Sequence, residues 1–205
     1  MIEASTKFKK ATVGDLLKVA KVVRKAKSEK SEVIIPNLRD SRNWTFETHT
    51  DAALGNLNDG IDSTGAHIIF ASNKKGKMAA LDWKSSMVKR VVRSSLAAEI
   101  MVLIDGIENA LHLRNMMEEL LNLPKNSIPI KATVDNNSLV ASLNSTSSVD
   151  DKRLRRDIGA VKQMLERKEV TEVGWCPGNE QLADTMTKAT APAHRLLQAI
   201  QTVGS

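Results

Sequence analysis

Apolar residues recur at helical spacing close to the start of the chain. In residues 13–25 they fall on one side of a helix, and Lys18, Lys21 and Lys25 fall on the other. This pattern predicts an amphipathic helix with a basic outer face. Residues 26–32 are typical of a linker, 33–36 of a short extended piece and 37–43 of a turn. We therefore expect a basic helical arm over residues 1–43 and a separate domain over 44–205.

Residues that favour strands dominate the next part of the chain. They predict strands over 44–54, 67–72 and 78–86, separated by turns over 55–65 and 73–77. Ser94 or Ser95 can cap the long helix that follows, which we expect to run to about Leu121 and to be stopped by Pro124 and Asn126.

Strands and helices alternate in the rest of the chain. The pattern predicts a strand over 128–134, a turn and short helix through Leu143, an amphipathic helix over 154–165, a strand over 170–175 and a helical region from about Gln181. This order is typical of an α/β domain with a mixed five-stranded sheet flanked by helices on both faces. In such sheets, functional residues gather at strand ends near the switch in strand order.

Acidic residues occur at four places where a solvated carboxylate is unusual. Each lies inside or at the end of a predicted element: Asp51, Glu99, Asp135 and Asp184. Taken singly, each also fits an exposed strand or helix residue, a turn, or an acid favoured by a helix dipole. If the fold gathers all four, their repulsion requires cations, and oxygen ligands favour hard divalent ions such as Mg²⁺.

Charge is unevenly distributed along the chain. The net charge is +6, and residues 1–45 hold 11 of the 30 Lys and Arg but only 5 of the 24 Asp and Glu, which leaves 19 of each in the remainder. A basic arm before a neutral domain favours contact with nucleic acid phosphates, with a solvated lysine face as the alternative. Three Trp, three Phe and no Tyr argue against a protein that binds by base stacking.

The single cysteine, Cys176, excludes an internal disulfide and a cysteine-rich zinc site, and it is typical of a reducing compartment. No apolar run approaches the roughly 18 residues of a membrane span, and lysines interrupt the first 30 residues, so no signal peptide is predicted. We expect a soluble intracellular protein.

Five short motifs occur in a familiar order: Thr50–Ala53 (TDAA), Trp83–Ser86 (WKSS), Arg93–Glu99 (RSSLAAE), Val134–Ser138 (VDNNS) and Gln181–Lys188 (QLADTMTK). Their order and intervals resemble the ribonuclease H domain of copia-type (pseudoviral) LTR retrotransposon Pol polyproteins over roughly residues 44–190. Upstream, Lys10–Leu17 and the basic helix are similar to the segment that leaves the reverse transcriptase. The C-terminal tail is similar to the end of Pol.

The resemblance implies an enzyme that hydrolyses the RNA strand of RNA/DNA hybrids with two Mg²⁺ or Mn²⁺ ions. Its catalytic and metal-binding acids match Asp51, Glu99, Asp135 and Asp184. Asp51 would bridge the ions, Glu99 and Asp135 would complete one and Asp184 the other. Many relatives carry a His before the last acid, but residues 174–180 contain none, as in copia-type members. This difference would act on turnover or product release rather than on the reaction.

The resemblance also implies partners and a location. An RNA/DNA hybrid and the reverse transcriptase part of the same polyprotein are the expected partners, in the cytoplasm or in virus-like particles and without a membrane. The candidate nucleic-acid contacts are Asn136 and Asn137 as readers of the 2′ hydroxyl, and Lys89, Arg90, Arg93, Lys18, Lys21 and Lys25 as phosphate ligands. His49 shares the strand face of Asp51 but is more typical of a packed or exposed histidine than of a ligand.

Two other functions fit the same fold. One is a non-catalytic nucleic-acid-binding or scaffold remnant of a Pol polyprotein. The other is a transposase or integrase nuclease, which is the weaker alternative because those enzymes usually carry Asp, Asp and Glu in that order, whereas Glu99 comes second here.

Overall fold

The chain divides into two compact units, Met1–Val33 and Ile34–Ser205. The computed structural model describes residues 11–28, 33, 35–38, 43–55, 63–145, 150–188 and 190–201. Residues 29–32, 34, 39–42 and 56–62 of the predicted linker, extended piece and turns therefore lie outside the described residues, as does Lys10 of the upstream motif. Residues 33, 35 and 36 of the predicted extended piece are described and belong to no strand.

The first unit contains the helix α2 (Val13–Ser28), which confirms the predicted amphipathic helix and extends it by three residues. Thr12 and Asp15 cap its start: the Thr12 backbone N–H donates to Asp15 Oδ2 at 3.0 Å, and the Asp15 N–H donates to Thr12 Oγ1 at 3.2 Å. Val13 and Leu16 are exposed, as are the three predicted phosphate-binding lysines. The helix thus carries an apolar side beside its basic side.

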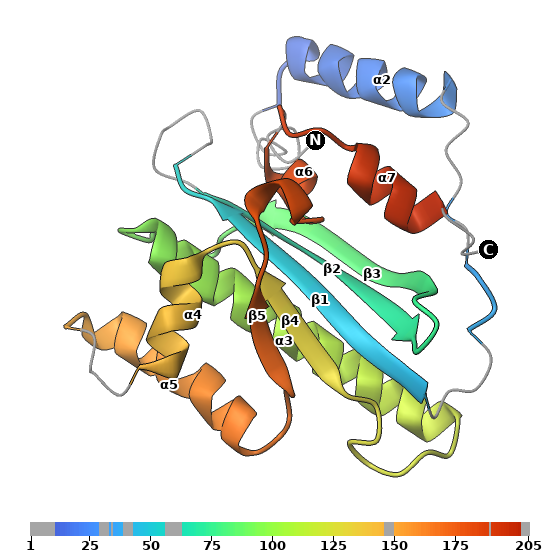
Figure 1. Cartoon of the computed structure of the whole chain (residues 1–205). Coiled ribbons are helices and arrows are strands. Elements are labelled where there is room, and N and C mark those ends of the chain that lie inside the picture. The colour runs from blue at the N-terminus through green and yellow to red at the C-terminus, as the bar shows by residue number, and fades with distance from the viewer. Residues whose placement is uncertain are drawn as a thin grey trace. The chain divides into compact units, whose positions relative to one another are not determined.

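The second unit is built on a five-stranded sheet with the order β3-β2-β1-β4-β5 (Figure 1). β1 (Trp44–Ala53), β2 (Thr64–Asn73) and β3 (Met78–Met87) form an antiparallel meander. β4 (Ile130–Val134) runs parallel to β1, and β5 (Glu172–Trp175) runs parallel to β4. This arrangement confirms the predicted mixed sheet. The order switches between β1 and β4, which is where functional residues are expected in a sheet of this kind.

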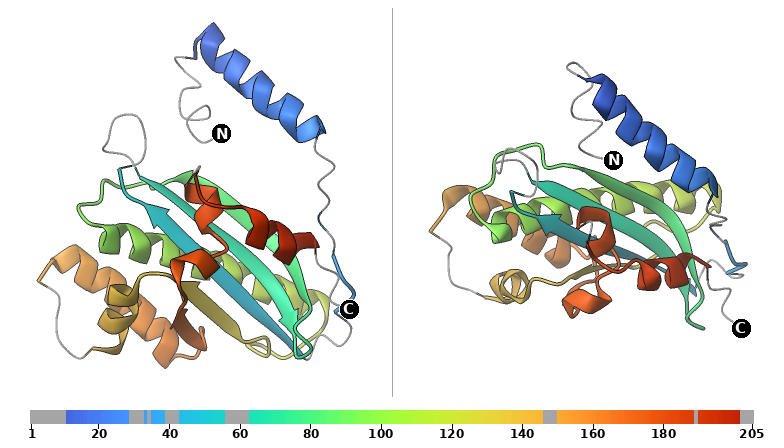
Figure 2. Two further views of the ribbon diagram at one scale, coloured as in Figure 1. Left: turned by 45° about the horizontal axis from the view of Figure 1, so that its top comes forward. Right: turned by 90° about the horizontal axis from the view of Figure 1, so that it is seen from above.

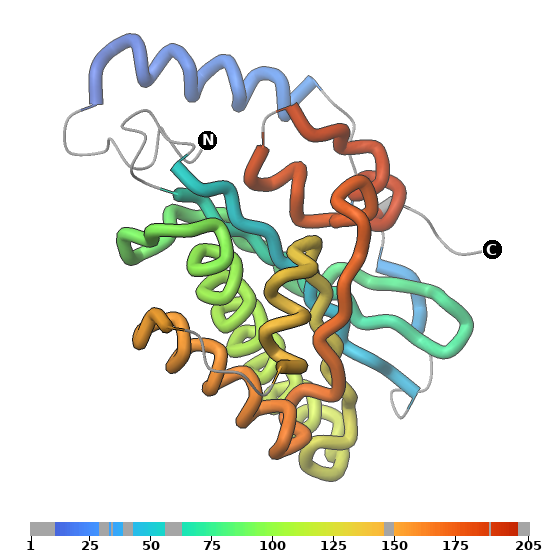
Figure 3. Tube along the Cα trace, turned by 60° about the vertical axis from the view of Figure 1, so that its left-hand side comes forward, coloured from blue at the N-terminus to red at the C-terminus, as the bar shows by residue number. Residues whose placement is uncertain are grey.

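Helices cover both faces of the sheet, as predicted. α3 (Ser95–Leu120), α4 (Asn137–Asn144) and α5 (Lys152–Glu166) lie on one face (Figures 1 and 3). The short η3 (Gly178–Glu180), α6 (Asp184–Thr187) and α7 (His194–Gln201) follow β5, and α6 and α7 lie on the other face (Figure 2). No helix in the described ranges is long and apolar enough to cross a bilayer.

The main core lies between α3 and the sheet. Ile100, Leu103 and Ile107 of α3 are fully buried against Phe46 and Ile130 of the central strands. Burying a side chain of this size contributes about 1.5–3 kcal/mol each, so this face anchors α3 firmly. A smaller cluster on the opposite face includes Ile68, Phe70 and Ala80 of the sheet, packed against Leu182, Met186 and Leu196 from the C-terminal segment.

A glycine lets α3 approach β1 closely. A Cβ atom at Gly106 would lie 2.6 Å from Thr50 Cγ2 and 3.1 Å from Thr48 Oγ1, both on β1. Ser94 caps the N-terminus of α3, because its side chain accepts a hydrogen bond from the Ala97 N–H. The helix therefore begins at a fixed place and holds its first turns near the end of β1.

Candidate active site

Two of the four acids lie at neighbouring strand ends. In the parallel pair β1 and β4, His49 stands opposite Thr133, and Asp51 and Asp135 each follow two residues later. Carboxyl ends of parallel strands meet at one edge of a sheet, so this register places both carboxylates at the same edge. Asp51 is fully buried and Asp135 is partly buried.

The third acid comes from α3. Glu99 lies in the first turns of the helix, only 5% exposed, and its carboxylate faces Asp51 and Asp135. One oxygen from each of the three side chains lies within 4.8 Å of the others. The structure thus brings together three of the four acids identified from the sequence, although they are separated by up to 84 positions along the chain.

Burial and mutual repulsion raise the proton affinity of this group. Desolvation, followed by the negative charges of Asp51 and Asp135, raises the pKa of Glu99 to about 8. Burial and the charge of Asp51 also raise the pKa of Asp135. Among the described residues, no hydrogen-bond donor reaches Glu99 Oε2. A buried carboxylate oxygen without a partner is costly, and a cation at this point would satisfy it.

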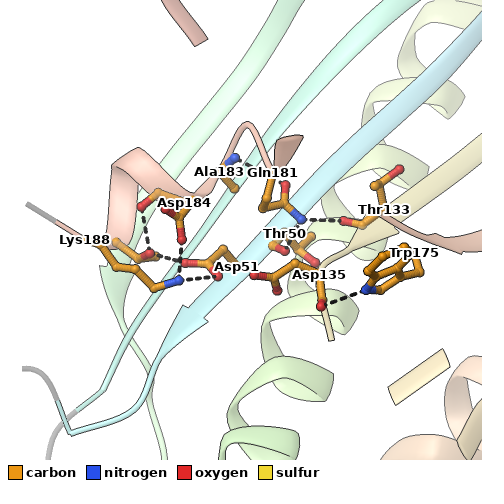
Figure 4. A network of polar contacts seen from close by, with 10 residues as sticks. Thr50, Asp51, Thr133, Asp135, Trp175, Gln181, Ala183, Asp184 and Lys188 are labelled. Carbon is orange, nitrogen blue, oxygen red and sulfur yellow. Dashed lines mark hydrogen bonds and ion pairs between the residues drawn. The ribbon is translucent and has the colours of Figure 1, made fainter. Parts of the chain in front are cut away.

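The fourth acid lies nearby but is held differently. Asp184 is the first residue of α6, and its Oδ1 atom forms an ion pair with Lys188 Nζ one turn later. The same ammonium lies 3.4 Å from Asp51 Oδ1 (Figure 4). Thr187 Oγ1 donates a hydrogen bond to Asp51 Oδ2. Asp184 therefore reaches the other acids through Lys188 and is not a member of the three-acid group.

The surrounding acids stabilise the protonated form of Lys188. Burial lowers the pKa of its ammonium, but Asp184, Asp51 and Asp135 together outweigh burial and raise the pKa above its ordinary value. Neither Lys188 nor Thr187 was among the site residues predicted from the sequence. The spacing of Asp184 and Lys188 was the available signal, since an acid and a lysine four residues apart meet on one helix face.

Two further side chains brace the strand ends. Gln181 Nε2 donates to the backbone oxygens of Thr50 at 3.1 Å and Thr133 at 3.2 Å, which links β1 to β4 just before the acids (Figure 4). Trp175 Nε1 donates to the Asp135 backbone oxygen at 3.0 Å. Neither contact has a sequence signal, because both depend on how the segment after β4 folds back over the sheet.

The segment that carries Asp184 is tied to the far side of the sheet as well. Ser85 Oγ on β3 donates to the Met186 backbone oxygen at 2.6 Å. Leu182 and Met186 pack in the smaller core cluster. These contacts position a helix of only one turn, which local propensity alone would not stabilise.

The proposed nucleic-acid contacts lie at several places. Asn136 caps α4, because its Oδ1 accepts from the Leu139 N–H at 3.1 Å, and Asn137 begins that helix. Arg90 pairs with Asp157 at 2.7 Å, while Lys89 and Arg93 are exposed. Arg90 and Arg93 border a groove of about 550 Å³ together with Lys152 and Arg153. Lys18, Lys21 and Lys25 belong to the other unit, on α2.

Two histidines and the cysteine lie in packed surroundings rather than among the four acids. His49 packs edge-on against Phe70, with ring centroids 6.2 Å apart, which confirms the packed interpretation. Burial, then the charges of Asp135 and Glu180, raises the pKa of the Cys176 thiol to about 11, as expected for a passive thiol. His67, which carried no sequence signal, is buried between Asp82 at 3.5 Å and Asp105 at 3.4 Å.

Solved structures share this architecture. LC11-RNase H1, isolated from compost by a metagenomic approach, superposes with a TM-score of 0.50 at 15% sequence identity, over 72% of this chain and 95% of that chain. The fold is that of ribonuclease H. The expected ribonuclease H-like sheet with helices on both faces is thereby confirmed.

Two other solved structures are similar at lower scores. LC11-RNase H1 in complex with an RNA/DNA hybrid has 14% identity, covering 72% of this chain and 96% of that chain, with a TM-score of 0.49. The RNase H domain of prototype foamy virus has 13% identity, covering 77% and 90%, with a TM-score of 0.42. No protein-family model matches the chain, and no curated protein matches its sequence.

Proposed function

We propose that the second unit is a metal-dependent ribonuclease H that hydrolyses the RNA strand of RNA/DNA hybrids. The observation that carries this proposal is the convergence of Asp51, Glu99 and Asp135 at the strand-order switch, with Asp184 beside them. Three buried or half-buried carboxylates within 4.8 Å of one another have little structural value on their own, because their repulsion opposes folding. The ribonuclease H fold supports the same conclusion.

The donor set fits Mg²⁺ or Mn²⁺. All candidate ligands are carboxylate oxygens, which hard divalent cations prefer, and the group contains neither the sulfur nor the histidine nitrogen that favours zinc. A bound cation would give Glu99 Oε2 the partner that it lacks, and it would favour the ionised carboxylate that burial now disfavours. Asp51, Glu99 and Asp135 would hold one ion, and Asp51 and Asp184 would hold a second.

Bound ions would activate the attacking water and stabilise the leaving oxygen at phosphorus. The chain's own residues prepare this site. Gln181 fixes the ends of β1 and β4, so that Asp51 and Asp135 keep their separation. Thr187 orients the Asp51 carboxylate by donating to Oδ2. Because its pKa is raised to about 8, the Glu99 carboxyl holds its proton near neutral pH, and it would have to lose that proton to serve as a ligand.

Substrate recognition would involve backbone contacts rather than base stacking. The exposed Lys89 and Arg93, and the groove that Arg93 borders, are suited to phosphates of the hybrid. Asn137 and the main chain near Glu99 are the proposed readers of the 2′ hydroxyl, whereas the side-chain oxygen of Asn136 is engaged in capping α4. The lysines of α2 would add phosphate contacts from the arm.

The biological setting proposed here is reverse transcription of a copia-type retrotransposon. The five sequence motifs support it, as does the similarity of the N-terminal segment to the end of a reverse transcriptase. In this setting the partners are the hybrid and the reverse transcriptase of the same polyprotein. The enzyme would act in the cytoplasm or in virus-like particles.

The test is cleavage of a hybrid labelled on its RNA strand, in Mg²⁺, by the full chain and by four variants: Asp51→Asn, Glu99→Gln, Asp135→Asn and Asp184→Asn. We expect cleavage by the parent and a loss of at least about a hundredfold in the Asp51 and Glu99 variants, since electrostatic groups at a reacting centre each contribute on the order of that factor. Glu172→Gln is the matched control, because Glu172 pairs with Lys131 at the opposite end of β5.

The outcomes separate the candidate functions. Cleavage that survives Asp51→Asn comes from a contaminating nuclease. A parent that binds the hybrid but does not cut it in Mg²⁺ or Mn²⁺ is the scaffold remnant. Cleavage of duplex DNA in preference to the hybrid would favour the transposase or integrase alternative.

A further inference from the structure

Lys188 lies between two acids that are proposed to share a metal ion. Its Nζ atom pairs with Asp184 Oδ1 and lies 3.4 Å from Asp51 Oδ1 (Figure 4). The Asp51 side chain is 1% exposed and that of Asp184 is 18% exposed, so both carboxylates have little water around them. An ammonium in such a place neutralises repulsion that would otherwise destabilise the folded chain.

The four acids are therefore divided into two unequal halves. Asp51, Glu99 and Asp135 face one another, and the described residues place no cationic group among their converging oxygens at ion-pair distance except Lys188 at Asp51. Asp184 instead directs an oxygen to Lys188. Glu99 and Asp135 thus have no counter-ion at ion-pair distance among the described residues, whereas Asp51 and Asp184 share one, Lys188.

The same oxygen of Asp184 cannot contact the ammonium and a divalent cation at full strength together. A cation that enters between Asp51 and Asp184 meets a positive charge within contact distance of both. Two charges about 4 Å apart repel strongly even at the effective permittivity of a protein surface. The ion must therefore displace Lys188 before it can bind both carboxylates.

The structure also provides a place for the displaced side chain. Lys188 is 41% exposed and borders a groove of about 290 Å³. The groove is lined in part by Asp135, Asp184 and Arg195, so it belongs to the same acidic site. A lysine has four rotatable side-chain bonds, and the exposed part of Lys188 gives its ammonium room to leave Asp51 by rotation of the side chain alone.

We propose that Lys188 is an intramolecular competitor of the divalent cation at the Asp51–Asp184 half of the site. This inference rests on the proposed function, because it assumes that the acids bind metal. Lys188 is a positioning residue in this scheme: it holds Asp51 and Asp184 in place before loading and sets a lower affinity for the second ion than for the first.

The experiment is a calorimetric titration of the full chain with Mn²⁺ and, separately, Mg²⁺, without nucleic acid. The parent is compared with Lys188→Met, Lys188→Gln and Lys188→Arg. The matched control is Lys131→Met, because Lys131 also pairs with an acid, Glu172 at 3.2 Å, but at the far end of β4. We expect the weaker class of ions to bind about tenfold more tightly to Lys188→Met and Lys188→Gln, and as in the parent to Lys188→Arg and Lys131→Met.

Thermal unfolding of the same proteins gives a second readout. In a chelator, Lys188→Met should melt below the parent, because the repulsion of Asp51 and Asp184 is no longer compensated. In Mg²⁺ it should recover more than the parent does, because tighter binding to the native state stabilises it further. Lys188→Gln can still donate to Asp184, and it carries the test if the Met variant does not fold.

Failure of the inference can be distinguished from failure of the proposed function. If parent and Lys188 variants bind ions with equal affinity, the competition is refuted while the metal site stands. Weaker binding in both neutral variants would refute it too, since Lys188 would then help to build the second site. If neither parent nor variants bind ions, both proposals are wrong. If the neutral Lys188 variants bind the ions and the parent does not, Lys188 excludes the ions completely, which supports the inference.

Discussion

Burial of the Glu99 carboxyl beside two other acids lowers the free energy of unfolding, so replacement of Glu99 by glutamine should stabilise the metal-free protein. The pKa of this carboxyl is raised from 4.5 to about 8, first by burial and then by Asp51 and Asp135. Below pH 4.5 the carboxyl is protonated whether or not the chain is folded, so its ionisation does not affect the free energy of unfolding. Between pH 4.5 and about 8 the unfolded chain is ionised at this position and the native chain is not.

Rising pH therefore favours unfolding through this window. The native state binds more protons than the unfolded state, and each pH unit above 4.5 removes about 1.4 kcal/mol until the native carboxyl ionises. At pH 7 the ceiling is on the order of 3 kcal/mol. Glu99→Gln removes the ionisation but still buries an amide that needs partners, which lowers the expected gain to about 1–3 kcal/mol.

The assay is urea unfolding at pH 5, 6, 7 and 8 in the presence of a chelator. The difference in unfolding free energy between Glu99→Gln and the parent should be small at pH 5 and grow with pH. In a thermal melt at pH 7, each kcal/mol of this difference should raise the melting temperature of the variant by roughly 2–4 °C. The control is Glu172→Gln, whose side chain is 57% exposed and which should differ from the parent by no more than about 0.5 kcal/mol.

Saturating Mg²⁺ should reverse the order, because the parent gains binding energy that the variant lacks. An ion at a hundred times its dissociation constant stabilises the parent by about 2.7 kcal/mol. A variant that is no more stable than the parent at pH 7, or whose advantage does not change between pH 5 and 8, would refute the view that Glu99 is held as a strained acid awaiting a cation.

The packing and the charges lead to three other predictions. Gly106→Ala should lower the unfolding free energy by about 1–2 kcal/mol and reduce hybrid cleavage, because its methyl group meets Thr50. The control Gly159→Ala lies in α5, where the added methyl group has open space, and it should leave the unfolding free energy unchanged or raise it by up to about 1 kcal/mol. Equal urea midpoints for the two variants would contradict this prediction. Because burial lowers the pKa of His67 below 6.5, the unfolded chain takes up a proton that the native chain does not, so the unfolding free energy should fall as pH drops below 6.5. In urea titrations over a series of pH values, His67→Gln should make this fall shallower, whereas replacement of the exposed His112 by glutamine should leave it unchanged. Replacing Lys18, Lys21 and Lys25 by glutamine should reduce the salt dependence of hybrid binding by about 0.7–0.9 in log–log slope for each lysine that binds a phosphate, and an unchanged slope in fluorescence anisotropy would assign the arm lysines to a solvated face.

Much of the fold could be predicted because the local signals agree with the tertiary structure. The strand that contains Phe46, the cap at Ser94 and the amphipathic helices are each encoded by nearby residues, and their order alone restricts the topology. The three-acid group could be proposed because its members stand at predictable places, at two strand ends and on one helix.

The rest depends on contacts between distant segments. Nothing near Gln181 indicates that its side chain bonds to Thr50, which lies 131 positions earlier. Lys188 could have been paired with Asp184 from the helix spacing, but its approach to Asp51 requires α6 to lie across the sheet. His67 likewise resembles an ordinary strand residue until Asp105 of α3 is brought beside it.

The link from Gln181 to Thr50 and Thr133 has a consequence for synthesis of the protein. A ribosome makes Asp51, Glu99 and Asp135 well before it makes Gln181, Asp184 and Lys188, and a domain generally folds as a unit. A nascent chain that ends before Gln181 therefore contains three of the acids but lacks both the side chain that joins β1 to β4 and the fourth acid. Nuclease competence would then arrive late in translation, which would delay RNA cleavage until nearly the whole domain has been made.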